Sequence, residues 1–186
     1  MGLSRMGATI LIGLLLSSCA PKSTVTVFGD SDIAASANAL EGRIYFVPEF
    51  TDKLPDFTTL EPIGVVYTST LDIAPRSFEE GFPGISDRFE WFALHYTGTL
   101  FISTAGEYTF ELLSDDGSKL YIDDALVLDN DGIHPAVALT TSYPLEAGEH
   151  ALRIDYFQGP RTEIALQLFI TPPSGERQLL DTTVVY

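Results

Sequence analysis

The stretch Tyr108-Thr-Phe-Glu-Leu-Leu-Ser-Asp-Asp-Gly-Ser-Lys-Leu-Tyr-Ile122 decides the fold of this 186-residue chain. Apolar and polar residues alternate from Glu107 to Leu112, and Leu120 and Ile122 continue the alternation further on. This period of two is typical of β-strands with one buried face. Asp115-Asp116-Gly117 lies between the two runs and is typical of a tight turn. The stretch therefore predicts two strands joined by a hairpin-like turn that presents two adjacent carboxylates.

Two adjacent carboxylates repel each other, so Asp115 and Asp116 are either fully solvated or neutralised by a cation. Ca²⁺ is the natural candidate because it takes oxygen ligands in a flexible geometry. Asp and Gly are also common turn residues, which makes a plain hydrophilic turn the alternative. The local sequence leaves both interpretations open.

Short runs with the strand period recur along the rest of the chain. They lie at residues 43–47, 63–67, 89–96, 99–103, 106–113, 119–122, 125–128, 136–143, 148–157 and 164–171, with a further edge strand at 178–186. Prolines recur between Pro48 and Pro83 and argue against a long helix there. Many short strands without an amphipathic helical run predict an all-β fold, an antiparallel sandwich or barrel.

One of these runs, residues 89–96, is apolar on both faces. Phe89, Trp91 and Ala93 share one face, and Phe92 and Leu94 share the other. A strand of this kind is usually buried between two layers, so Trp91 is expected in the core rather than at a sugar-binding surface.

The N-terminus has Arg5, an apolar run from Ile10 to Leu16 and then Ser17-Ser18-Cys19. This pattern resembles the bacterial lipobox, in which a signal peptidase cuts before the cysteine and its thiol carries diacylglycerol. The apolar run is shorter than the roughly 20 residues that a transmembrane helix needs. An ordinary secretory signal or a short anchor helix is the alternative.

The lipobox resemblance divides the chain into four expected parts. They are a signal peptide at 1–18, the lipidated Cys19 with a flexible tether to residue 39, a β domain at 40–175 and a C-terminal tail or edge strand at 176–186. Ala20 follows the cysteine, and the absence of Asp there resembles the pattern that permits export to the outer membrane. The expected location is the bacterial cell envelope, with the chain lipid-anchored to the outer membrane on its periplasmic or surface side.

Composition excludes several classes of function. The formal net charge of −16 repels nucleic acid, so no nucleic-acid partner is expected. Cys19 is the only cysteine, which rules out an intramolecular disulfide. The sequence contains no H-E-x-x-H, G-x-S-x-G or P-loop motif, and we expect no enzymatic activity.

Several blocks of the chain agree in order and spacing with one known family. The blocks are Gly106-Glu-Tyr-Thr-Phe110, Ser114-Asp-Asp-Gly-Ser-Lys-Leu-Tyr-Ile-Asp123, Leu126-Val-Leu-Asp-Asn130, Leu145-Glu-Ala-Gly-Glu-His150 and Tyr156-Phe-Gln-Gly159. From about Leu40 to Thr171 the chain resembles the PA14 (PA-fourteen) domain, a module named after a fragment of anthrax protective antigen that also occurs in glycosidases and yeast flocculins. The resemblance implies an antiparallel, jelly-roll-like β-sandwich or barrel.

The resemblance also implies a site. In sugar-binding members of the family, two consecutive aspartates joined by a cis peptide bond hold Ca²⁺, and the ion chelates sugar hydroxyls. Asp115 and Asp116 match these positions. The implied cofactor is therefore Ca²⁺, and the implied ligand is a glycan.

The second half of that site departs from the family pattern. A later loop of the sugar-binding members supplies an Asn side chain and main-chain carbonyls, whereas the corresponding loop here, residues 157–163, has no Asn. Gln158 or Glu163 could supply an oxygen in its place. Arg161 would oppose a cation, and it could instead pair with the aspartates and replace Ca²⁺.

Two functional hypotheses follow. The first is a membrane-tethered lipoprotein that recognises carbohydrate through Ca²⁺ at Asp115 and Asp116. The second is a non-catalytic structural or protein-interaction module that docks another envelope protein and has no metal or sugar site. The paired aspartates favour the first, and the missing Asn together with Arg161 favours the second.

Overall fold

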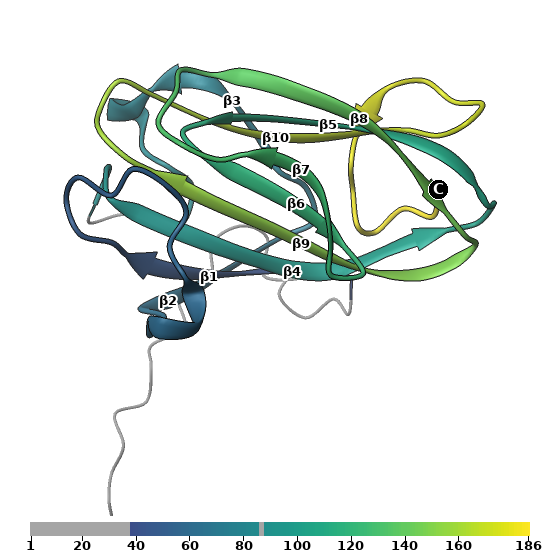
Figure 1. Ribbon diagram of the computed structural model, residues 1–186, viewed down its shortest axis with the longest axis horizontal. Helices are drawn as coiled ribbons and strands as arrows, with labels where there is room; N and C mark the ends of the chain where they lie inside the picture. Colours follow the sequence, from purple (N-terminus) through teal and green to yellow (C-terminus); the bar gives the residue numbers. More distant parts are fainter. Residues whose placement is uncertain (1–37, 86–87) are drawn as a thin grey trace, which may run out of the picture.

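The protein, described here by a computed structural model for residues 38–85 and 88–186, consists of two antiparallel β-sheets packed face to face (Figure 1). One sheet has six strands in the order β2-β1-β4-β9-β6-β7. Their bounds are β1 Leu40–Phe46, β2 Gly64–Thr68, β4 Phe92–Ile102, β6 Ser118–Ile122, β7 Ala125–Asn130 and β9 Gly148–Gln158. The predicted all-β antiparallel sandwich is confirmed.

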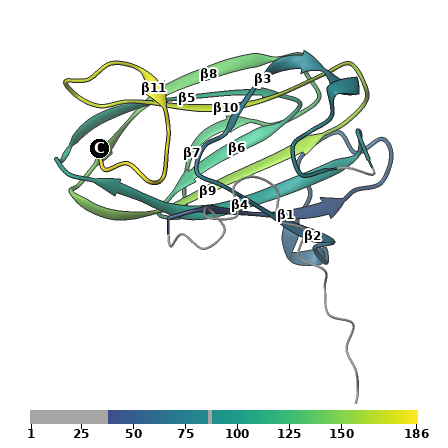
Figure 2. The same cartoon turned by 180° about the vertical axis from the view of Figure 1, so that it is seen from behind.

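The second sheet has five strands. Their bounds are β3 Asp72–Ser77, β5 Gly106–Asp115, β8 Val137–Leu145, β10 Glu163–Thr171 and β11 Gln178–Leu179. β10 pairs with β5 on one side, and with both β3 and β11 on the other (Figure 2). The sequence did not indicate β3, because Pro75 interrupts its pattern; proline is tolerated here because this strand pairs on one side only.

The turn after β5 is not a hairpin, which corrects the local prediction. β5 pairs with β8 and β10 in the five-stranded sheet, whereas β6 pairs with β7 and β9 in the six-stranded sheet. Asp116 and Gly117 therefore carry the chain from one sheet to the other. A crossing of this kind passes beside the core, and both residues are buried.

Alternating residues of the two sheets form the core between them. Its fully buried side chains include Phe92, Leu94, Phe110, Leu120 and Tyr156. These residues occupy every second position of their strands, as the period of two predicts for faces that pack against each other.

A second, smaller apolar cluster lies on the outer face of the six-stranded sheet. It contains Tyr45, Val47, Ala93 and Phe157, and the half-buried Leu54, Phe57, Leu60 and Trp91 pack against it. The β1–β2 loop covers this face, which explains why the sequence around Ala93 is apolar on both sides. β4 begins only at Phe92, so Trp91 lies just before this inner strand and is half-buried. The expectation that Trp91 belongs to the core between the layers is wrong.

The C-terminal residues return to the sandwich. β11 is followed by isolated bridges that pair Thr70 with Asp181 and Phe101 with Val185. Within residues 38–85 and 88–186, the helices are two short 3-10 turns at Phe57–Thr59 and Phe78–Glu80. No helix in this described part of the chain is long and apolar enough to cross a membrane. The lipobox and Cys19 lie outside the described residues.

The hairpin formed by β6 and β7 tests the core assignment. Leu120 is 0% exposed and Leu126 is 50% exposed. We predict that Leu120→Ala lowers the free energy of unfolding by about 2–5 kcal/mol, because it leaves a cavity, whereas Leu126→Ala changes it by less than about 1 kcal/mol. Urea unfolding of both variants measures the difference, and equal losses would contradict the assignment.

Candidate functional site

Three connections meet around the paired aspartates at one end of the sandwich (Figure 1). They are the β5–β6 crossing, the β7–β8 loop at residues 131–136 and the β9–β10 loop at residues 159–162. The peptide bond between Asp115 and Asp116 is cis. Both aspartates are buried, with exposed fractions of 2% and 3%, so the fully solvated turn is excluded.

Backbone N–H groups from both neighbouring loops bind the Asp116 carboxylate. The N–H of His134 donates to Oδ1 at 3.2 Å, and the N–H of Gly159 donates to Oδ2 at 2.8 Å. Burial raises the pKa of Asp116, and these two donors oppose the rise. Asp116 thus connects the β7–β8 and β9–β10 loops through one carboxylate.

The Asp115 carboxylate is less well compensated. Its Oδ2 is buried and accepts no hydrogen bond from the part of the chain that the structure describes. Burial, the charge of Asp116 and the charge of Glu163 raise the pKa of Asp115 from 3.8 to about 6. A buried carboxylate oxygen without a donor is the kind of atom that a bound cation stabilises.

Gln158 lies at the centre of the site and is fully buried. Its Nε2 donates to Asp116 Oδ2 at 3.2 Å, and it also lies 3.2 Å from the carbonyl oxygen of Glu163 and 3.5 Å from that of Pro160. Three oxygens therefore surround the amide nitrogen: one carboxylate oxygen and two main-chain carbonyl oxygens.

Tyr156 supports Gln158 from the core. Its hydroxyl lies 2.6 Å from Gln158 Oε1 and 2.6 Å from the carbonyl oxygen of Asp115. Burial, together with the charges of Asp116 and Asp115, raises the pKa of Tyr156 well above its ordinary value, so the hydroxyl keeps its hydrogen. One hydroxyl hydrogen serves only one of the two oxygens. The sequence placed Tyr156 in a predicted strand and in a block that matches the family, but gave it no role in the site.

The side chains of the remaining predicted site residues, Arg161 and Glu163, form no hydrogen bond or ion pair with the two aspartates among the contacts of the described residues. The Arg161 side chain is 68% exposed, and its Nε pairs with Glu90 Oε2 at 3.2 Å instead of with Asp115 or Asp116. Glu163 is exposed and reaches the site through its carbonyl oxygen, which accepts from Gln158. The structure therefore brings together Asp115, Asp116 and Gln158, with Glu163 as a main-chain neighbour.

The crossing is too crowded for any residue other than glycine at position 117. A Cβ atom there would lie 2.8 Å from the backbone nitrogen of Gly132 and would also overlap the ring of Phe157. The β5–β6 crossing, the β7–β8 loop and the second apolar cluster therefore contact one another directly, and this contact fixes the position of the aspartates.

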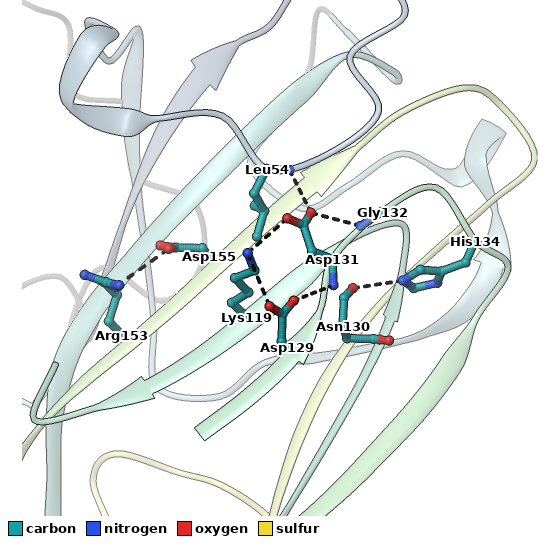
Figure 3. A network of polar contacts seen from close by, with 9 residues as sticks. All are labelled: Leu54, Lys119, Asp129, Asn130, Asp131, Gly132, His134, Arg153 and Asp155. Atoms are coloured by element: carbon teal, nitrogen blue, oxygen red, sulfur yellow. Dashed lines mark hydrogen bonds and ion pairs between the residues drawn. The ribbon is translucent and has the colours of Figure 1, made fainter. Parts of the chain in front are cut away.

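A polar network beside the crossing holds the β1–β2 and β7–β8 loops in place (Figure 3). Asp131 Oδ1 accepts from the N–H of Leu54 at 2.8 Å and from the N–H of Gly132 at 2.9 Å, while its Oδ2 pairs with Lys119 Nζ at 3.1 Å. Lys119 also pairs with Asp129 at 3.5 Å. Asp129 at the end of β7 and Asp131 in the β7–β8 loop thus share the positive charge of one lysine.

The site offers enough oxygen ligands for Ca²⁺ only if side-chain and main-chain oxygens are counted together. Within the described residues, no group of three or more His, Cys, Asp or Glu side chains is arranged to hold a metal ion. The oxygens around Gln158 Nε2 and the orphan Oδ2 of Asp115 are of the type that Ca²⁺ binds, carboxylate and carbonyl. A half-turn of the Gln158 amide would exchange its nitrogen for an oxygen among them and let Nε2 donate to the Tyr156 hydroxyl. The residues therefore fit the ion.

Comparison with known proteins establishes the family. The PA14 domain model matches residues 37–183, most of the chain, and the chain belongs to the PA14 domain family. Two solved structures with a similar fold are a PA14 domain of the antifreeze protein MpAFP (TM-score 0.64, 19% identity, covering 80% of this chain and 89% of that one) and a PA14 sugar-binding domain from an RTX adhesin (TM-score 0.63, 18% identity, covering 78% and 96%).

A curated relative is the anti-sigma-I factor RsgI3 of Acetivibrio thermocellus. It is 26% identical over 108 residues, which is 58% of this chain. The match spans only 17% of the relative's own length.

The raised pKa of Asp115 gives a prediction for the metal-free protein. The folded state holds a proton on this carboxyl more tightly than the unfolded state, so ionised Asp115 destabilises the fold above about pH 6 and this penalty disappears as the pH falls towards 3.8. In EDTA, the stability of the wild type relative to Asp115→Asn should therefore rise by about 1–2 kcal/mol between pH 7.5 and 4.5. Urea unfolding at each pH measures it; a difference that stays constant or falls would refute the assignment.

Proposed function

We propose that this protein is a non-catalytic carbohydrate-binding lipoprotein of the bacterial envelope, and that it binds glycans through Ca²⁺ held at Asp115 and Asp116. The observation that carries the proposal is the burial of two adjacent carboxylates, one of which has an oxygen without a donor in the described chain. Burying a charge is costly unless it is paired, so a cation at this position would recover free energy that the protein alone does not.

The proposed ligands come from three segments. Asp115 and Asp116 supply carboxylate oxygens, Gln158 supplies its amide oxygen after the half-turn, and Glu163 supplies its carbonyl oxygen. Gln158 takes the role that an Asn side chain has in the sugar-binding pattern. When bound, Ca²⁺ supplies open coordination positions that pairs of sugar hydroxyls can fill.

The fold comparison supports a binding role. A sugar-binding PA14 domain of an RTX adhesin has a similar fold, and the paired aspartates here lie at an end of the sandwich where loops meet. Loops on a rigid β-scaffold are a common place for binding sites. The envelope location and the anchor at Cys19 rest on the N-terminal sequence alone.

One observation favours the second candidate, a structural or protein-interaction module. Both oxygens of Asp116 already accept hydrogen bonds from the protein, so this carboxylate is satisfied without a cation. In that case the buried pair would serve to tie the β7–β8 and β9–β10 loops together, and Asp115 would take up a proton below about pH 6, because its pKa is raised to about 6.

Thermal unfolding in EDTA and in a Ca²⁺ series to about 10 mM separates the two candidates. Ca²⁺ at 100 times its dissociation constant adds roughly 2.7 kcal/mol, and we expect the unfolding midpoint of the wild type to rise by several degrees. Asp115→Asn should remove the rise. Asp124→Asn, at an exposed turn of the β6–β7 hairpin, removes the same charge and should leave the rise intact. No rise for the wild type, together with a blank glycan array in Ca²⁺, would refute the first candidate.

A further inference from the structure

The most exposed large apolar side chain in the described chain belongs to Phe50, at 85% exposure. Phe50 is the third residue of a turn closed by the N–H of Thr51, which donates to the carbonyl oxygen of Pro48 at 3.3 Å. Its φ is 67°, a backbone conformation that glycine adopts easily and a bulky side chain does not. An exposed ring and a positive φ both disfavour phenylalanine at this position.

Trp91 shares the positive φ of Phe50. Its φ is 61°, and its ring lies 5.9 Å from that of Phe50, at an interplanar angle of 49°. Trp91 is half-buried and packs against the second apolar cluster, and its ring contacts the ring of the exposed Phe50. Strained backbone positions of this kind cluster where a protein grips a ligand. We call Phe50 and Trp91 the aromatic pair.

The aromatic pair borders the Asp115–Asp116 site through Gly159. The N–H of Gly159 donates to Asp116 Oδ2 at 2.8 Å, while its carbonyl oxygen accepts from the N–H of Trp91 at 3.4 Å. The N–H of Trp91 also donates to the carbonyl oxygen of Gln158 at 2.8 Å. A single residue thus separates the backbone of Trp91 from the carboxylate of Asp116.

A second connection fixes the loop that carries Phe50. The N–H of Leu54, in the same β1–β2 loop, donates to Asp131, and Lys119 neutralises that carboxylate (Figure 3). Asp131 also accepts a hydrogen bond from the N–H of Gly132, in the same β7–β8 loop as His134, whose N–H donates to Asp116. The β1–β2 loop is therefore attached to the same framework as the aspartates.

We propose that the aromatic pair is the second half of the glycan site and stacks against one face of a neutral pyranose ring whose hydroxyls bind the Ca²⁺ ion held at Asp115 and Asp116. This inference rests on the proposed function. A pyranose has an apolar face of C–H groups and a polar rim of hydroxyls, so it matches an aromatic surface beside a cluster of oxygens and a cation. The net charge of −16 disfavours acidic sugars, which is why the ligand is assigned as neutral.

The single tryptophan of the chain provides the readout, since the emission of Trp91 reports on this position alone. The full domain in 5 mM Ca²⁺ is titrated with the methyl glycosides of glucose, galactose and mannose, and with glucuronic acid as the charged probe. We expect at least one neutral glycoside to change the emission of Trp91 and to bind more tightly than glucuronic acid.

Variants at position 50 test the role of the ring. Phe50→Gly suits the backbone and removes the ring, so it should weaken binding of that glycoside about tenfold or more while leaving folding stability and the Ca²⁺-induced midpoint shift unchanged. Phe50→Tyr keeps the ring and should bind within about threefold of the wild type. Leu126→Ala, an exposed apolar truncation in the β6–β7 hairpin, is the matched control and should bind as the wild type does.

The outcomes separate this inference from the proposed function. Binding by the wild type that persists unchanged in Phe50→Gly refutes the aromatic platform and leaves the Ca²⁺ site standing. Loss of stability or of the Ca²⁺ response in Phe50→Gly assigns Phe50 a structural role and also refutes the platform. A wild type that binds none of these sugars refutes the aromatic platform, and the Ca²⁺-induced midpoint shift and the glycan array then decide the proposed function separately.

Discussion

The burial of two adjacent carboxylates, at the point where the chain crosses from one sheet to the other, is the constraint on which this end of the molecule depends. Asp115 and Asp116 are almost completely removed from solvent. Charges in such a position need compensation, and the neighbouring loops supply it only in part. Asp116 receives N–H groups from His134 and Gly159, whereas Asp115 keeps one oxygen without a donor.

The other residues of the site pack around these two carboxylates. The crossing requires glycine at position 117, which lets the β7–β8 loop and Phe157 close over the aspartates. The buried hydroxyl of Tyr156 reaches from the core to Gln158, whose amide lies among three oxygens. The same packing places the β1–β2 loop and Trp91 next to the site. Core, loops and site are therefore one connected structure.

The sequence predicted most of the strands, because the period of two is a local signal. It failed for β3, where Pro75 hides a strand paired on one side only, and for Trp91, because the β1–β2 loop that covers the outer face is far from β4 in the sequence. The nature of the β5–β6 connection could not be predicted either, since strand pairing into two different sheets is a property of the whole chain.

The candidate site was predicted in its residue types and not in its geometry. Asp115, Asp116 and Gln158 do meet, but the partners that distinguish the two aspartates come from loops 18 and 43 residues away. Arg161 was expected near the pair and instead binds Glu90, which is 71 residues away in the chain. Such long-range partners leave no periodic signal in a single sequence.

Calorimetric titration with Ca²⁺ measures whether the oxygens around the Gln158 amide hold a cation. We predict one Ca²⁺ bound per chain at pH 7.5, and tighter binding by Gln158→Glu, because a carboxylate supplies an anionic oxygen where the amide must first turn. No Ca²⁺ binding by either protein up to about 10 mM would contradict it, and the buried pair would then be a structural tie between two loops.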